Sequence, residues 1–270
     1  MHEAAPLLIS STEDGLTAPD SATPGQRSFR SETTAAGVGW VGLARLADGV
    51  TWDRFRRDLQ AVVSDEQERI VKGMAALDGD AVLLGGAVIH PGRPGEFTAE
   101  LVAGQHVLFD YPDTASDNPA PRYRSLTVEG STQDSPVPDA AGTVRAVLTP
   151  DGPVFEVLGT PTAGQPLAFD NAMPRPYLAE AVVFPVADEV GAEELAEFFN
   201  AFVDGSPEWP PNPPFDLGLG CGTLPLSAGG RSVHRLAAGA GRHVVVNWLK
   251  DPTDGVRMAK RGQYRVIELG

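Results

Sequence analysis

Two stretches of the chain repeat one another, and this internal repeat limits the possible folds more than any other feature. Residues 7–36 and 144–173 both pass from alternating apolar residues through an Asp-Gly turn to a Gly-Gln pair. The match aligns Gly25 with Gly164, 139 positions later. A similarity at such a long spacing indicates that a whole structural unit occurs twice.

A second pair of similar segments supports the same interpretation. Residues 103–118 and 240–255 share the pattern Ala-Gly-x-His-Val, which aligns His106 with His243, 137 positions later. Two independent anchors at nearly one spacing predict two copies of one domain. We expect the copies at 1–129 and 143–270, with 130–142 as a linker.

Each copy is expected to be a β-sandwich. Short runs with period-two alternation, such as residues 97–101, are typical of half-buried strands. Asp-Gly and Pro-Gly pairs separate these runs at intervals typical of sandwich turns. The sequence therefore predicts a mainly β protein.

The middle of each copy changes to a helical period. Trp52, Phe55, Leu59 and Val62 form one apolar stripe, which predicts a helical insertion over about 51–77. A Ser-x-x-Gln capping box at residues 64–67 predicts the start of its second helix. In the second copy a helix is expected over about 191–203. A proline-rich loop at 205–218 follows it.

The second half of each copy resembles a known family. A strand that ends at a glycine is followed by Gly-x-His-Val, an aspartate- and proline-containing loop, a glycine turn and a last strand such as Val-Ile-Glu-Leu. This order resembles cupredoxin-like domains of the plastocyanin and azurin type. The resemblance implies two tandem cupredoxin-like Greek-key β-sandwiches, each with a helical insertion.

The ligands of a blue-copper site are missing from both copies. Such a site needs two imidazoles, a thiolate and a weak axial ligand. The sole cysteine, Cys221, lies about twenty-five positions too early for the thiolate. The family positions fall instead near Trp40 and Tyr177 for the first imidazole, at Asp110/Tyr111 and Asn247/Trp248 for the thiolate, and near Gln263 for the axial ligand. We therefore expect no blue copper and no other cofactor.

Composition excludes several other classes of protein. A formal net charge of −15 repels nucleic acid and anionic lipid. The sequence contains no run of eighteen apolar residues, so we expect no transmembrane helix. Basic residues that are mostly Arg, with abundant Ala, Gly and Pro, are typical of actinobacterial sequences. The first residues show no secretion signal, so we expect a mature extracellular or cell-envelope chain, with a cytoplasmic location left open.

Two groups of side chains are candidate metal ligands. His106 and His243 occupy the same position in each copy, where they could form one site between the domains. Asp110, Asp113 and Asp117 form an oxygen-rich loop of the kind that binds calcium. The alternative is that the histidines begin strands and that the aspartates cap their own turns.

The proline-rich loop is the candidate partner-binding segment. Trp209, Pro210, Pro211 and Phe215 combine stiff extended backbone with aromatic rings, which suits docking of a partner. The alternative is a stiff loop whose rings pack back on the sandwich.

No catalytic set can be assigned from these residues. We therefore expect a non-catalytic extracellular or cell-envelope binding or structural protein that meets a protein partner or a second copy of itself. One alternative is a non-blue copper- or calcium-binding protein. The other is a carboxylate-based enzyme with an interdomain cleft, using Asp110, Asp113, Asp251 and Asp254.

Overall fold

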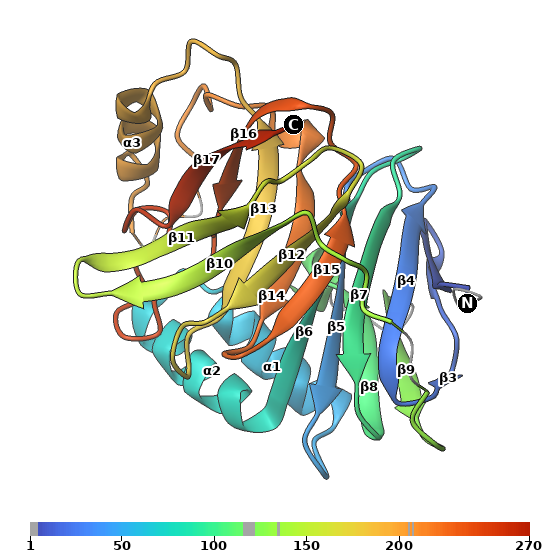
Figure 1. The fold of residues 1–270 in the computed structure, drawn as a ribbon. Coiled ribbons are helices and arrows are strands. Elements are labelled where there is room, and N and C mark those ends of the chain that lie inside the picture. Colours follow the sequence, from blue (N-terminus) through green and yellow to red (C-terminus); the bar gives the residue numbers. More distant parts are fainter. Residues whose placement is uncertain (1–4, 116–121, 134–135, 205, 207) are drawn as a thin grey trace.

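The computed structural model describes residues 5–115, 122–133, 136–204, 206 and 208–270 (Figure 1). The first half of the chain contains β1 (Leu7–Thr12), β2 (Gly15–Thr17), β3 (Ser21–Ala22), β4 (Gly25–Thr33), β5 (Gly39–Leu46), α1 (Trp52–Val62), α2 (Gln67–Asp80), β6 (Ala81–Ile89), β7 (Gly95–Leu101), β8 (Gly104–Asp110), the 3-10 helix η1 (Pro112–Ala115) and β9 (Tyr123–Val128). The second half contains β10 (Gly142–Thr149), β11 (Gly152–Gly159), β12 (Pro166–Asn171), β13 (Ala179–Pro185), α3 (Ala192–Asn200), the 3-10 helix η3 (Leu217–Leu219), β14 (Cys221–Leu226), β15 (Arg231–Arg235), β16 (Gly241–Val246) and β17 (Tyr264–Leu269).

The strands form two large sheets, and both halves contribute to each sheet. Within the described residues, the first sheet has eight strands in the order β11-β10-β12-β15-β7-β4-β1-β2. The second has nine, in the order β17-β16-β13-β14-β6-β5-β8-β9-β3. Except for the short β3, each sheet has the same strand order in both halves, read outward from its centre. The order β7-β4-β1-β2 of the first half corresponds to β15-β12-β10-β11 of the second, and β6-β5-β8-β9 corresponds to β14-β13-β16-β17. The protein is therefore a mainly β, two-sheet structure of two β-sandwiches set edge to edge.

The halves meet where two pairs of strands hydrogen-bond across a seam. In the eight-stranded sheet β7 pairs antiparallel with β15, with Thr98 opposite Val233. In the nine-stranded sheet β6 pairs with β14, with Leu84 opposite Leu226. Edge strands that would otherwise expose unpaired backbone groups thus satisfy one another.

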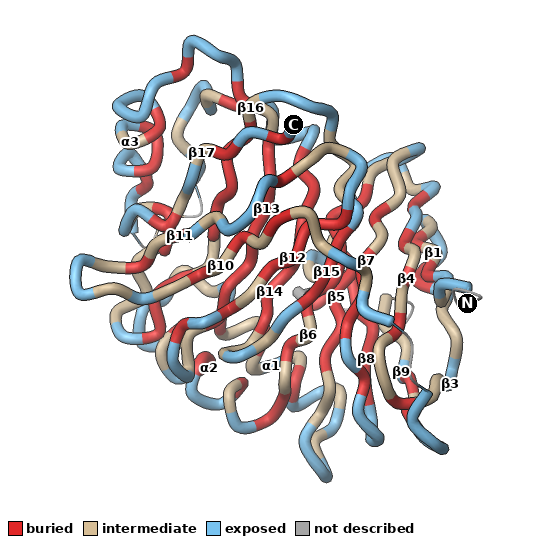
Figure 2. Tube along the Cα trace, viewed as in Figure 1, coloured by how far each residue is buried: buried red, intermediate tan, exposed pale blue. Residues whose placement is uncertain are grey.

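The nine-stranded sheet is the middle layer of the molecule. One face packs on the eight-stranded sheet through residues such as Phe29, Phe97 and Val41. The other face is covered in the first half by α1 and α2 and in the second half by α3 (Figure 1). Because both faces are buried, its central strands are almost continuously apolar, and Figure 2 shows the buried residues along them.

Both helical segments lie where the sequence predicts them. Phe55, Leu59 and Val62 of the predicted stripe are buried against the sheet. The predicted capping box is wrong in detail, because α2 begins at Gln67 and its N-cap residue is Glu66. Ser64 instead accepts a hydrogen bond from the backbone N–H of Glu66, which makes a turn before the helix. None of the helices in the described part of the chain is long and apolar enough to cross a membrane.

Glycines at matching places shape the strands next to the seam. Gly86 in β6 and Gly222 in β14 have φ values of +144° and +120°. A Cβ at these positions would lie 2.1 Å from the carbonyl oxygen of Val41 and 2.2 Å from that of Ala181. Only glycine can accept this backbone conformation together with such a close approach.

Candidate functional site

A cavity of about 220 Å³ lies on the helix-covered face of the nine-stranded sheet, where the two halves meet. Residues from β5, α1 and β6 of the first half face residues from β13, β14 and the segment after β16. The full lining comprises Trp40, Leu59, Val62, Val63, Asp65, Leu83, Tyr111, Leu178, Glu180, Leu224, Pro225, Trp248, Leu249, Lys250 and Arg257. An apolar wall with a few convergent polar groups is the usual character of a small-molecule site.

Glu180 is the buried carboxylate of this cavity. It lies on β13, and its side chain is on the same face as Val182 and Phe184, toward the helices. Only 7% of it is exposed, and within the described residues its one hydrogen bond comes from the backbone N–H of Trp248 to Oε1, at 3.1 Å. Burial raises the pKa of Glu180 to about 7, although the Trp248 N–H and the charge of Arg257 act in the opposite direction.

Three ring side chains accompany this carboxylate. Strand pairing places Arg45 opposite His106 in the first half and Pro185 opposite His243 in the second, so Arg45 and Pro185 are equivalent. Trp40 and Glu180 each lie five residues before them, on β5 and β13, and are therefore equivalent too. By the same register Tyr111 is equivalent to Trp248. Burial, and to a smaller extent the charge of Glu180, raises the pKa of Tyr111 well above its ordinary value. The phenol is therefore neutral and can only donate or accept a hydrogen bond.

Two cations also line the cavity. The Lys250 ammonium donates to the carbonyl oxygen of Ser64 and to Oδ1 of Asp65, the latter at 3.2 Å. The Arg257 guanidinium lies over the ring of Phe202, 5.0 Å from its centroid. Among the described residues it makes no hydrogen bond and no ion pair. Burial lowers the pKa of both cations below their ordinary values, and the charges of Asp65 and Asp204 act in the opposite direction.

The helical insertion of the first half closes the cavity by binding the second half. Besides the Lys250 contacts, the Gln67 side chain donates to the carbonyl oxygen of Asp254. Arg175 donates to the carboxylate of Asp78 at 2.8 Å. These contacts link α2 and the loop before it to two segments of the other half, one before β13 and one after β16.

His106 and His243 are structurally equivalent but are not brought together. Each is buried, and its Nδ1 lies within hydrogen-bond distance of the carbonyl oxygen two residues earlier, at 3.3 Å for His106 and 3.0 Å for His243. They lie on β8 and β16, and four strands separate these two in the sheet. At about 4.8 Å per strand, the imidazoles are some 24 Å apart, too far for one ion.

The aspartates of the predicted loops have different surroundings. Asp251 and Asp254 accept hydrogen bonds within their own turn, from Thr253 and from the backbone N–H of Val256, and both pair with Arg261. Asp110 is buried at the end of β8. The side chain of Asp113 and all of Asp117 lie outside the described residues. Within the described part of the chain, no group of three or more His, Cys, Asp or Glu residues could hold a metal ion.

The positions that correspond to blue-copper ligands in the second half carry amides. The Nδ2 of Asn247 donates to Oε1 of Gln263 at 2.7 Å, and the Gln263 amide contacts Sδ of Met173 at 3.4 Å. All three residues are buried. Two amides bonded to each other, with one thioether and no thiolate or imidazole among them, do not fit copper. Cys221 is elsewhere on β14, and burial raises the pKa of its thiol to about 12.

The proline-rich segment packs largely back on the protein. Phe215 is only 6% exposed and stacks on Phe184, with ring centroids 5.0 Å apart. It therefore cannot present its ring to a partner in this structure. Trp209 is 46% exposed, and its ring centroid lies 4.8 Å from that of Trp248. Pro211 is exposed and Pro210 half-buried, so docking through these three residues stays a prediction.

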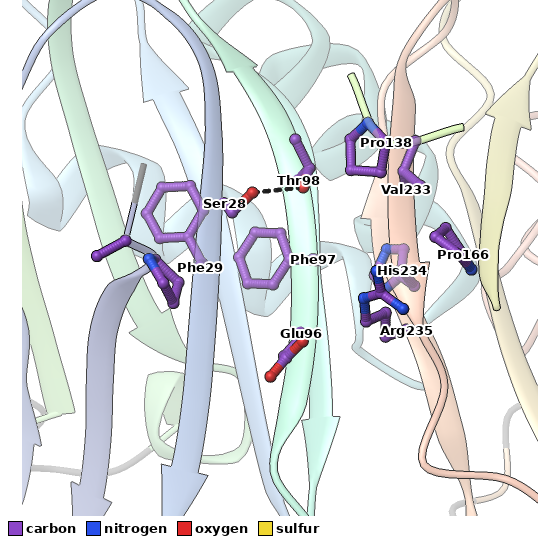
Figure 3. A pocket seen from close by; sticks show the side chains of 12 residues that line it. Ser28, Phe29, Glu96, Phe97, Thr98, Pro138, Pro166, Val233, His234 and Arg235 are labelled. Atoms are coloured by element: carbon purple, nitrogen blue, oxygen red, sulfur yellow. Dashed lines mark hydrogen bonds between the residues drawn. The ribbon is translucent and has the colours of Figure 1, made fainter. Parts of the chain in front are cut away.

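A second cavity of about 300 Å³ lies over the seam of the eight-stranded sheet (Figure 3). Its polar groups already have partners in the protein. Ser28 bonds Thr98 at 2.9 Å, and Arg235 donates to the carbonyl oxygen of Gly164 at 3.2 Å. Burial lowers the pKa of His234 to about 3, and this neutral ring bonds the hydroxyl of Ser232. The cavity beneath α1, with its incompletely bonded charges, is the stronger candidate for a ligand.

No protein-family model matches the chain, and no curated protein matches it in sequence. Among solved structures it is similar to Lac15 from a marine microbial metagenome, at 13% identity and a TM-score of 0.27 over 98% of this chain and 66% of Lac15. It is similar to auracyanin A, a blue copper protein from Chloroflexus aurantiacus, at 12% identity and a TM-score of 0.30 over 46% of this chain and 100% of the other. A multicopper oxidase matches at 11% identity and a TM-score of 0.25, over 98% of this chain and 88% of that protein. TM-scores this low carry no argument about activity.

Glu180 and Arg257 are not among the site residues that the sequence patterns predict. Glu180 stands in the run Ala-Glu-Ala-Val-Val-Phe-Pro, where it is the one charged residue of an otherwise apolar segment. A charge in such a segment is a signal, because both faces of this strand are buried. Arg257 gave no comparable signal, since it lies in a loop whose position only the tertiary structure fixes.

Proposed function

We propose that the chain is a non-catalytic binding protein of the extracellular space or cell envelope, whose small-molecule ligand enters the cavity beneath α1. It would be built from two degenerate cupredoxin-like domains, 1–129 and 143–270, joined by 130–142. The observation that carries the proposal is Glu180, a buried carboxylate that has one hydrogen bond within the described part of the chain and lines a cavity with ring side chains. Burying such a group costs free energy, and a ligand that donates to it would recover part of that cost.

The composition of the cavity favours binding over chemistry. Its lining contains no Ser, His or Cys that could act as a nucleophile with a neighbouring base. Of its two carboxylates, Asp65 is paired with Lys250, so Glu180 has no second unpaired carboxylate in the lining to share acid and base roles with. The apolar walls would instead hold the body of a ligand.

The test uses a variant that blocks the cavity without altering the core. Val63 lines the cavity and is 51% exposed, so Val63→Trp should close the entrance. Val203, which is 67% exposed and is not part of the cavity lining, provides the matched control Val203→Trp. Thermal shift with a library of amino acids, small acids and small amines, followed by calorimetry, is expected to find a compound that binds wild type and Val203→Trp but not Val63→Trp. Binding that Val63→Trp leaves intact, or no binding at all, would refute the proposal.

A carboxylate-based enzyme with an interdomain cleft is the second candidate. The observation that favours it is the burial of Glu180 in the lining of this cavity, which raises its pKa to about 7 and so suits a general acid or base at neutral pH. In this version Glu180 replaces Asp110, Asp113, Asp251 and Asp254 of the sequence prediction. Chemical conversion of the bound compound, seen by mass spectrometry and lost in Glu180→Gln, would favour the enzyme over the binding protein.

A further inference from the structure

Two opposite charges line the cavity without pairing with each other. Glu180 and Arg257 each act on the pKa of the other, although Asp65 and Asp204 act more strongly on Arg257, and the charged atoms of Glu180 and Arg257 are not within the 4.0 Å of an ion pair. Among the described residues, Glu180 has one hydrogen-bond donor, the backbone N–H of Trp248. Arg257 offers all five N–H donors, and within the described residues none of them finds an acceptor. A ligand in the cavity therefore meets hydrogen-bond acceptors on Glu180 and hydrogen-bond donors on Arg257.

The other charged groups at the cavity are already satisfied. Lys250 is 9% exposed in its side chain and is held by Asp65 and by the Ser64 carbonyl oxygen. Asp65 and Asp204 also act on the pKa of Arg257, but Asp65 already accepts a hydrogen bond from Lys250 and Asp204 accepts one from Lys260. The charged groups that a ligand can still bond are therefore one carboxylate, Glu180, and one guanidinium, Arg257, which favours a molecule that itself carries both signs.

The apolar walls and the size of the cavity limit the rest of the ligand. Trp40, Tyr111 and Trp248 offer ring faces, and Leu59 and Leu224 offer aliphatic surface. Aromatic faces attract a nearby ammonium group as well as an apolar body. The volume of about 220 Å³ is below that of drug-sized ligand sites, which begin near ~300 Å³. The ligand is therefore small.

We infer that the ligand is a small zwitterion of the α-amino acid class with a nonpolar side chain. Its ammonium group donates to Glu180, its carboxylate accepts from Arg257, and its side chain lies against the rings of Trp40 and Trp248. This inference rests on the proposed binding function and names the class of ligand for the same cavity. Charge-assisted hydrogen bonds at both ends select against molecules that lack either group.

The experiment compares three probes that share one side chain. L-phenylalanine carries both charges, 2-phenylethylamine only the ammonium and 3-phenylpropanoate only the carboxylate. Isothermal titration calorimetry measures each against wild type, Glu180→Gln and Arg257→Gln, with the exposed Glu156→Gln as control. L-leucine, 3-methylbutylamine and 4-methylpentanoate repeat the series with a smaller body.

Wild type and Glu156→Gln are expected to bind the amino acid about tenfold or more tightly than either single-charge probe. In Glu180→Gln the advantage over the carboxylate probe should vanish, and in Arg257→Gln the advantage over the amine. Equal or tighter binding of a single-charge probe to wild type overturns the zwitterion while the binding function stands. The same holds if none of the probes binds but another compound does so in a Val63-dependent way. If nothing binds, the proposed function itself fails.

Discussion

Glu180 should make the stability of the protein fall as pH rises toward neutrality. Its pKa is about 7 in the folded protein, against an ordinary value of 4.5. Between these two values the folded state retains a proton that the unfolded state has released, so the free energy of unfolding decreases with increasing pH. Below pH 4.5 Glu180 is protonated in both states and does not affect the free energy of unfolding. Above about pH 7 it is ionised in both states, and the free-energy cost of burying its charge is fully present.

The magnitude follows from the two pKa values. Their difference corresponds to about 3 kcal/mol of stability lost between roughly pH 4.5 and pH 7. Glu180→Gln removes the titration but keeps a side-chain oxygen that can accept from the backbone N–H of Trp248. The variant should therefore gain stability relative to wild type as pH rises, by up to about 3 kcal/mol.

Urea denaturation at pH 5, 6, 7 and 8 measures this difference, with the midpoint and slope fitted at each pH. Glu156→Gln, at an exposed position on β11, is the matched control and should follow wild type at every pH. The reasoning is refuted if the difference between Glu180→Gln and wild type stays constant, within about 0.5 kcal/mol, from pH 5 to pH 8.

Three further outcomes test the packing and the buried histidine. Phe215→Ala should lower the free energy of unfolding by about 3–5 kcal/mol because its ring is buried, whereas Pro211→Ala at an exposed position should lower it little. Equal, small effects in chemical denaturation would contradict the burial of Phe215. Gly222→Ala should cost more than about 2 kcal/mol because of its positive φ and the Ala181 carbonyl, while Gly239→Ala, with open space around it, should not; similar melting temperatures would contradict the backbone argument. Burial, partly opposed by the Gly104 carbonyl, lowers the pKa of His106 to about 4, so stability should decline as pH falls from 6.5 toward 4, and NMR should find a neutral ring at pH 5.5; a charged ring there would contradict its burial.

Local patterns in the sequence are enough to predict the elements of each half. Alternation predicts the strand at 97–101, and the observed β7 runs from Gly95 to Leu101. The stripe from Trp52 to Val62 predicts α1, because side chains three and four residues apart share one face of a helix. These signals depend only on neighbours along the chain, so a single sequence contains them.

The candidate site could not be predicted in the same way. Asp251 and Asp254 satisfy their charges through Arg261 and their own turn, whereas Glu180 stands on a strand that the sequence marks only as apolar. Phe215 looks available in the sequence, but the ring cluster around Phe184 buries it. In each case contacts between residues far apart in the chain decide whether a polar or aromatic side chain is free to bind anything.

The sequence by itself determined the period of each segment, the recurrence of one pattern at about 137 positions and the absence of blue-copper ligands at the family positions. Only the tertiary contacts show that the halves share both sheets, with Thr98 opposite Val233 at the seam, and that α2 and the loop before it bond to the other half. They also show that Glu180 and Arg257 line one cavity. The physical reason is that hydrophobic period and turn chemistry act over a few residues, whereas burial of a charge depends on which distant surfaces exclude water from it.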